Sequence, residues 1–169
     1  MTQGWKEFCI LNLPTFPNLV RPFFENISLD AFHIESVVKG KHIEVSEHKL
    51  SDILQIPKEG ESYLVLKEKQ KTLRIILERT NVTGVIHVRA NQLSLEMRLL
   101  HNIISHIFLP WTGRFDWVSE RDLVFMRCLV EGEALNLPFI MLSQMREAAR
   151  RARACLLYGM VFTLLFQDA

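Results

Sequence analysis

The sequence has few cysteines, and their spacing excludes the zinc and redox motifs that paired cysteines form. Only three occur in 169 residues, at Cys9, Cys128 and Cys155, and none forms a C-x-x-C pair. We interpret them as reduced, mostly buried thiols, as is usual for free cysteines inside cells. Residues 1–10 also lack the basic and then apolar stretches of a secretory signal, so we expect an intracellular protein, nuclear or cytoplasmic.

Clustered glycines and suitably spaced histidines are also missing. A nucleophile elbow, a phosphate-binding loop and a dinucleotide fingerprint all need clustered glycines, but the seven glycines here are isolated. The six histidines include no H-x-x-x-H pair, the spacing that places two metal ligands on one helical face. We therefore predict no catalytic residues, no metal and no cofactor, and we do not expect an enzyme.

Neither sign of charge is in excess, and no apolar run is long enough to span a membrane. Twenty basic residues against nineteen acidic ones give a net charge of +1, so nucleic-acid binding would have to rest on a local patch. The longest apolar run, residues 154–166, falls short of the roughly 20 residues that a membrane span needs. We predict that it forms a buried core helix, with no membrane segment.

The apolar content is nevertheless high. Hydrophobic residues make up 49% of the chain and the mean hydropathy is +0.11. Large exposed apolar patches are uncommon on proteins that stay monomeric. We therefore expect a covered apolar surface, and with it a protein partner or a homo-oligomer.

Local patterns in the first half predict an irregular arm over residues 1–17, followed by a helix from residue 18 or 19. Residues 35–38 and 42–45 are predicted to form a β-hairpin around Gly40, whose backbone can adopt the positive φ of a tight turn. Ser46 fits the N-cap of a helix that must end near Ile56, because Pro57 follows.

The second half is predicted to be helical over residues 68–79 and 93–108, with a short strand between them over residues 82–88. The inward face of the 93–108 helix is expected to be a stripe of apolar side chains: Leu93, Met97, Leu100, Ile104 and Ile107, widened by Leu99, Ile103 and Phe108.

A capping signature begins the next predicted helix. Ser119 with Asp122 three residues later predicts its start, and Gly132 predicts its end. Residues 136–166 then hold one long helix or two. Taken together, the patterns predict a mainly α fold of about six helices with a small β-hairpin near residues 35–45, in a single domain over residues 18–169.

Two groups of side chains are candidates for contacts. Arg146, Arg150 and Arg153 lie within about 60° of one another on a helical wheel, and with Arg151 they form an arginine stripe that could bind phosphates or a partner. The alternative is a solvated helix face. Trp111, Phe115 and Trp117 form either a recognition surface or a loop packed onto the core.

Three sequence blocks, in this order, resemble a plant family. They are N-L-V-R-P-F-F-E-N-I (18–27), V-V-K-G-K-H-I-E-V-S-E-H-K-L-S-D-I-L-Q-I-P (37–57), and L-L-H-N-I-I-S-H-I-F-L-P-W-T-G-R-F-D-W-V-S-E-R-D-L-V-F-M-R-C-L-V-E-G-E-A-L-N-L-P (99–138). The family is the plant transposon protein domain of retrotransposon-derived reading frames. This resemblance implies an origin in a mobile element and carries over no catalytic residues; residues 146–169 match it only loosely.

These observations favour a non-enzymatic interaction or assembly domain that works through protein–protein contacts. The near-neutral charge, the apolar surplus and the missing site chemistry support this hypothesis. The alternative is nucleic-acid binding through the arginine stripe, which would make the affinity depend steeply on salt.

Overall fold

The computed structural model describes residues 3–30, 33–110, 115–150 and 158–169. They form two compact units. The central unit comprises residues 59–135, and the terminal unit combines residues 3–58 with residues 136–169. The central unit is therefore an insertion in the chain of the terminal unit. How many domains fold independently is a separate question, so the single domain over residues 18–169 stays a prediction.

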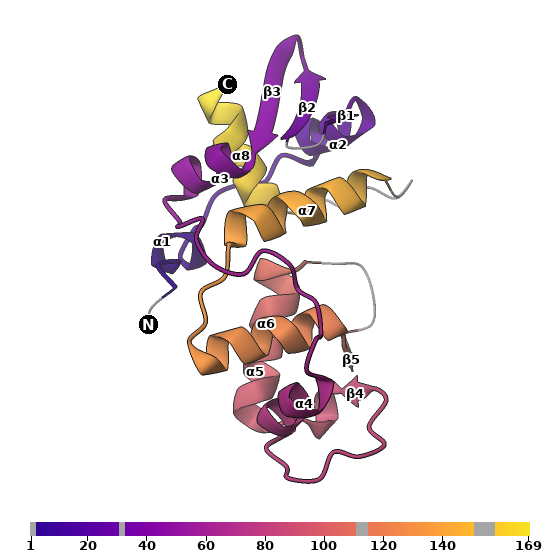
Figure 1. The fold of residues 1–169 in the computed structure, drawn as a ribbon. Coiled ribbons are helices and arrows are strands. Elements are labelled where there is room, and N and C mark those ends of the chain that lie inside the picture. Colours follow the sequence, from indigo (N-terminus) through magenta and orange to yellow (C-terminus); the bar gives the residue numbers. More distant parts are fainter. Residues whose placement is uncertain (1–2, 31–32, 111–114, 151–157) are drawn as a thin grey trace. The chain divides into compact units, whose positions relative to one another are not determined.

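The terminal unit contains five helices and one antiparallel sheet among its described residues (Figure 1). Its elements are α1 (Lys6–Cys9), α2 (Pro17–Glu25), β1 (Ser28–Leu29), β2 (His33–Val38), β3 (Lys41–Ser46), α3 (Glu47–Leu54), α7 (Leu137–Arg150) and α8 (Gly159–Asp168). The strands follow the order β1-β2-β3, and helices α2, α7 and α8 contact the sheet.

The predicted hairpin is confirmed by strands β2 and β3. Val38 pairs with Lys41, which leaves Lys39 and Gly40 as the two turn residues, with φ of 51° and 81°. Positive φ at both positions is the type I′ turn, whose twist matches that of the flanking strands. Strand β1 extends the sheet by pairing Ser28 with Glu35, an addition that the local pattern does not predict.

Aromatic side chains from the two ends of the chain form the core of the terminal unit. Phe23 on α2 lies 4.7 Å, centroid to centroid, from Phe162 on α8, and Phe24 lies 5.5 Å from the same ring. Both pairs have the edge-to-face geometry that aromatic rings favour. The predicted core helix is thus buried at Tyr158, Val161, Phe162, Thr163 and Leu165, whereas Met160 is exposed and residues 154–157 lie outside the described residues.

The central unit contains three α-helices and a two-stranded sheet among its described residues. Its elements are α4 (Lys69–Leu77), β4 (Val88–Arg89), the 3₁₀-helix η1 (Ala90–Gln92), α5 (Leu95–Ile103), the π-helix η2 (Ile104–Phe108), β5 (Trp117–Val118) and α6 (Glu120–Glu131). Helix α6 packs against α4, α5 and η2.

Both predicted N-caps are confirmed. The Ser46 hydroxyl accepts a hydrogen bond from the backbone N–H of Lys49 at the start of α3. At the start of α6, the Ser119 hydroxyl accepts from the N–H of Asp122, and the Asp122 carboxylate accepts from the N–H of Ser119. This capping box satisfies two N–H groups that the helix itself leaves unpaired. Gly132 ends α6 with φ of 71°, as predicted.

Several predicted boundaries are wrong. The described residues contain eight α-helices rather than about six: the predicted irregular arm includes α1, and the last segment, predicted as one long helix or two, forms two. The side chains of Trp5 and Phe8 are buried, so hydrophobic burial holds the arm in place. Tyr158 has φ of 55°, which an α-helix cannot contain, so α7 and α8 are separate. The strand predicted over residues 82–88 is reduced to β4.

At Gly60 the backbone segment that enters the central unit lies close to the segment that leaves it. Its φ is +112°, and a Cβ at this position would lie 2.4 Å from the backbone carbonyl of Ala134. The next residue, Glu61, donates its N–H to the Ala134 oxygen at 2.9 Å. A side chain at residue 60 would therefore force apart the two segments where the chain enters and leaves this unit.

We expect Gly60→Ala to lower the free energy of unfolding by about 3 kcal/mol or more, because the methyl group meets backbone atoms that cannot rotate away. The matched control is Gly40→Ala, which has φ of +81° but nothing within 4 Å of the new Cβ. It should cost about 1–2 kcal/mol, from the left-handed backbone alone. Urea unfolding followed by circular dichroism measures both, and equal losses would contradict the close approach.

Candidate functional site

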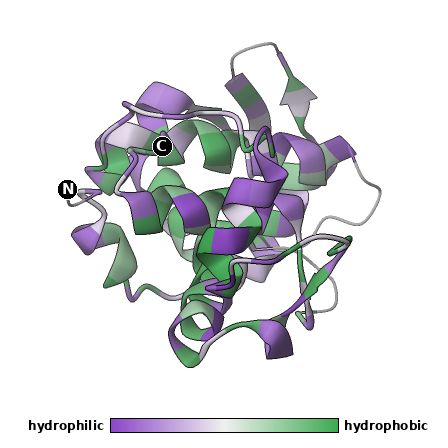
Figure 2. Ribbon diagram, turned by 60° about the horizontal axis from the view of Figure 1, so that its bottom comes forward, coloured by the Kyte–Doolittle hydropathy of each residue, from purple (hydrophilic) through white to green (hydrophobic). Residues whose placement is uncertain are grey.

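The outward face of α5 and η2 carries a row of exposed aliphatic side chains. Leu95 is 70% exposed, Leu99 58%, Ile103 43% and Ile107 37%. They are four residues apart, and side chains at this spacing form one continuous ridge along a helix surface. We call these four residues the α5 ridge. In Figure 2 the helices carry both hydrophobic and hydrophilic segments, as expected of amphipathic helices.

Polar side chains border the α5 ridge. Glu96, Arg98, Asn102 and His106 are all exposed on the same helical segment. The Arg98 guanidinium is held at the helix start by two hydrogen bonds, from Nε to the Ala90 oxygen and from Nη2 to the Leu93 oxygen, both 3.2 Å long. An apolar centre with a polar rim is the usual composition of a protein–protein interface.

The opposite face of α5 and η2 packs against α6. His101, Ile104, Ser105 and Phe108 are buried there, and the Phe108 ring stacks on Phe125 of α6 with centroids 5.5 Å apart. His101 is 3% exposed, and its Nε2 lies 3.5 Å from the Asp122 carboxylate. A buried carboxylate needs such polar neighbours, because transfer away from water is costly for a charged group.

This arrangement corrects the inward stripe predicted for residues 93–108. Leu93, Ile104 and Phe108 are buried as predicted, whereas three members of the stripe are exposed: Leu99, Ile103 and Ile107. The segment has apolar residues on two faces, so periodicity alone does not decide which one turns inward. The structure buries the face that contains His101, which the pattern counts as polar.

The aromatic candidates take part in ring contacts within the central unit. Phe115 is 42% exposed and stacks on His106, with centroids 4.4 Å apart. Trp117 lies half-buried in β5, with the His87 ring at 5.6 Å and the Arg89 guanidinium 4.8 Å from its ring centre. Trp111 lies outside the described residues. A role of these three aromatics in recognition stays a prediction.

Two of the four arginine candidates, Arg146 and Arg150, lie on α7 near its end. Arg146 is half-buried and makes an interaction within the chain, whereas Arg150 is exposed. Arg151 and Arg153 lie outside the described residues. The structure therefore places two of the four arginines on one helix, and the stripe as a phosphate-binding surface stays a prediction.

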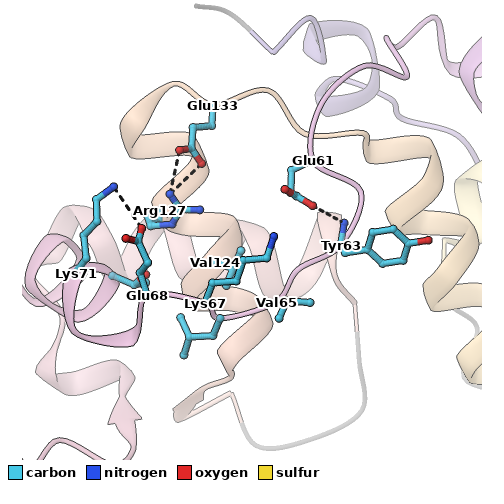
Figure 3. Close-up of a pocket in the computed structure, with 11 residues that line it drawn as sticks. Glu61, Tyr63, Val65, Lys67, Glu68, Lys71, Val124, Arg127 and Glu133 are labelled. Carbon is cyan, nitrogen blue, oxygen red and sulfur yellow. Dashed lines mark hydrogen bonds and ion pairs between the residues drawn. The ribbon is translucent and has the colours of Figure 1, made fainter.

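A pocket of about 250 Å³ lies between α4, α6 and the extended segment before α4 (Figure 3). Glu61, Tyr63 and Val65 line it from the extended segment, and Lys71 and Arg127 line it from the helices. Because its charged groups come from segments separated by about fifty positions, the sequence pattern does not predict this cluster.

Ion pairs compensate the charges beside this pocket. Arg127 binds the carboxylates of Glu131 and Glu133 at 2.6 and 2.9 Å, and Lys71 reaches Glu131 at 3.2 Å. The hydrogen bond from Arg127 and the one from Lys71 hold the pKa of Glu131 below its usual value. These contacts connect α4 to α6, which is a structural role.

Cys128 is a neutral thiol beside this network. Burial and a hydrogen bond to the Glu133 carboxylate raise its pKa to about 12. The thiolate, not the thiol, is the nucleophile. Cys128 therefore contributes packing rather than covalent chemistry at neutral pH.

Two further properties concern only the part of the chain that the structure describes. Within it, no group of three His, Cys, Asp or Glu side chains is arranged to hold a metal ion. None of its helices is both long and apolar enough to cross a membrane.

Comparison with known proteins gives one match. Residues 1–169, the whole chain, match the family model described as "Putative plant retrotransposon-related domain". No curated protein and no solved structure matches the chain.

The Glu131 ion pairs should make stability depend on pH. Because its pKa is lowered in the folded chain from an ordinary value of 4.5, their contribution is complete above pH 4.5 and is lost as the pH falls through the lowered pKa. We expect Glu131→Gln to destabilise the protein at pH 7 by less than about 1 kcal/mol, because the pair is partly exposed. The difference in the free energy of unfolding between this variant and the wild type should vanish in acid. Urea unfolding at several pH values tests it against Glu59→Gln, an exposed control; a pH-independent difference would contradict the ion-pair explanation.

The arginine stripe makes a separate prediction about nucleic acid. If it binds phosphates, its affinity for a labelled single-stranded nucleic acid should fall as the salt concentration rises. Replacing Arg150 and Arg153 by Ala should then reduce the slope of log affinity against log salt concentration by about 0.7 per lost phosphate contact. Arg79→Ala, which removes one exposed charge elsewhere, is the control. Fluorescence anisotropy measures the slope, and no binding at low salt would exclude this alternative.

Proposed function

We propose that this chain, which belongs to the putative plant retrotransposon-related domain family, is a non-enzymatic interaction domain that binds another protein surface through the α5 ridge. The observation that carries the proposal is the alignment of four exposed aliphatic side chains along one helical segment. Scattered exposed hydrophobic residues are normal on soluble proteins, but a contiguous row with a polar rim is typical of an interface.

The distribution of exposed apolar side chains supports the same surface. Thirteen large hydrophobic residues are exposed among those described, and nine of the thirteen belong to residues 59–135. Four of these nine form the α5 ridge. The central unit is therefore where we expect the partner to bind.

The size of the ridge limits how tightly it can bind alone. Its exposed fractions amount to about two fully exposed aliphatic side chains, whose burial contributes roughly 3–6 kcal/mol. Association costs about 4–15 kcal/mol in lost translational and rotational freedom. The α5 ridge therefore needs a partner surface that also contributes apolar area.

The absence of an enzymatic role is part of the proposal. Its support is the chemistry in and beside the pocket, where carboxylates bind Lys71 and Arg127 and the neighbouring Cys128 is held as a thiol. An active nucleophile or general base would need neighbours that shift its own pKa toward neutrality.

We expect Leu99→Asp to abolish partner binding, because a charge placed at the centre of the ridge would be buried without a counter-ion. The matched control is Val130→Asp, which changes an exposed aliphatic residue of α6, 46% exposed and outside the ridge. Light scattering after size-exclusion chromatography measures self-association. Quantitative affinity purification compares the proteins that bind to each variant. A protein that binds the ridge should be retained by the wild type and by Val130→Asp and lost from Leu99→Asp.

A wild type that neither self-associates nor retains any protein in a Leu99-dependent manner would contradict the proposed function. Equal losses in Leu99→Asp and Val130→Asp would contradict the assignment of the contact to the α5 ridge.

A further inference from the structure

We infer that the α5 ridge binds the α5 ridge of a second copy of this chain, in a parallel pair related by a two-fold axis. The inference rests on the proposed function and identifies its partner. Three properties of the described residues support it: the apolar area, the spacing of the ridge and the charges on its two sides.

The apolar area favours a partner that carries the same ridge. A symmetric pair buries two ridges for one loss of translational and rotational freedom, whereas a polar partner surface buries only one. Most of the exposed apolar area of the segment lies at its first two members, with Leu95 70% and Leu99 58% exposed. We therefore expect the contact to centre on these two leucines.

The spacing of the ridge suits packing against a copy of itself. Side chains four residues apart form a ridge inclined to the helix axis, and two such ridges interdigitate when the helices cross at about −50°. Such a crossing brings the helices closest at one point and separates them on either side. With the closest point at Leu99, the two copies of Leu99 lie next to each other at the two-fold axis.

The charges beside Leu99 favour the parallel orientation. On a helical wheel, Glu96 lies about 60° to one side of Leu99 and Arg98 about 100° to the other side. A two-fold axis along the helices places the Glu96 side of each copy against the Arg98 side of the other, which gives two Glu–Arg pairs. In an antiparallel pair each side would meet its own counterpart, so like charges would face each other.

Arg98 is already positioned for this role. Its Nε and Nη2 bind the backbone oxygens of Ala90 and Leu93, which fixes the guanidinium beside the first turn of α5. A guanidinium has five N–H donors, so these two bonds leave donors for a carboxylate. Fixing the side chain in advance also reduces the entropy lost when the pair forms.

Sedimentation velocity of the full chain over a wide concentration range tests the pairing. We expect a dimer whose dissociation constant rises about tenfold in Glu96→Arg and in Arg98→Glu, because each change sets like charges face to face. The double variant E96R/R98E exchanges the charges and should recover most of the affinity, as coupled residues do in a double-mutant cycle. Circular dichroism checks that Arg98→Glu, which also loses the backbone bonds, remains folded.

A disulfide tests whether the two ridges meet at Leu99. In a background with Cys9→Ser and Cys155→Ser, Leu99→Cys should form a cross-linked dimer under mild oxidation, because the closest approach at the two-fold axis brings residue 99 of both copies together. Ile86→Cys, at a position 72% exposed and outside the ridge, is the control and should cross-link much less. Equal cross-linking of the two variants would overturn the contact between the two ridges at Leu99.

The outcomes separate this inference from the proposed function. A wild type that stays monomeric at every concentration but retains another protein in a Leu99-dependent manner would overturn the second copy as partner and leave the interaction role intact. If the wild type dimerises but E96R/R98E does not recover the affinity that the single variants lose, the charge pairing is overturned. A monomer without any Leu99-dependent partner would overturn both.

Discussion

The packing of α5 and η2 against α6 is the constraint on which the candidate surface depends. Asp122 is 1% exposed and belongs to the capping box of α6, so its position is fixed by backbone hydrogen bonds. His101 of α5 lies 3.5 Å from this carboxylate, and the Phe108 ring of η2 stacks on Phe125 of α6. The face that carries His101, Ile104 and Phe108 is buried, and the α5 ridge is left on the opposite side, exposed.

Helix α6 organises the rest of the central unit in the same way. On one side it packs Phe125 against Phe108, and on another Arg127 binds the Glu131 carboxylate, which also binds Lys71 of α4. Most of its residues from Asp122 to Cys128 are buried. Four of the nine exposed large hydrophobic residues of the unit form the α5 ridge, on the face of α5 and η2 that does not pack against α6.

Features set by neighbouring residues could be predicted from the sequence, and features set by distant contacts could not. Lys39-Gly40, Ser46 and the Ser119–Asp122 pair determine local backbone hydrogen bonds, and all three predictions are confirmed. The orientation of α5 depends on its packing against α6, which lies further along the chain, and the pattern of residues 93–108 is apolar on two faces. A usable signal existed: Leu95, Leu99, Ile103 and Ile107 repeat strictly every four residues, whereas a buried face usually mixes spacings of three and four.

The way the central unit is closed explains how the α5 ridge can act as a surface of its own. The unit is inserted between residues 58 and 136, and the hydrogen bond from Glu61 to Ala134 joins its two ends. Gly60 permits this approach because it lacks a Cβ. Within the central unit, α5 and η2 pack against α6, so the face of the helix opposite the ridge is fixed by this packing. A partner that binds the ridge then meets a preformed surface, which lowers the entropy cost of association.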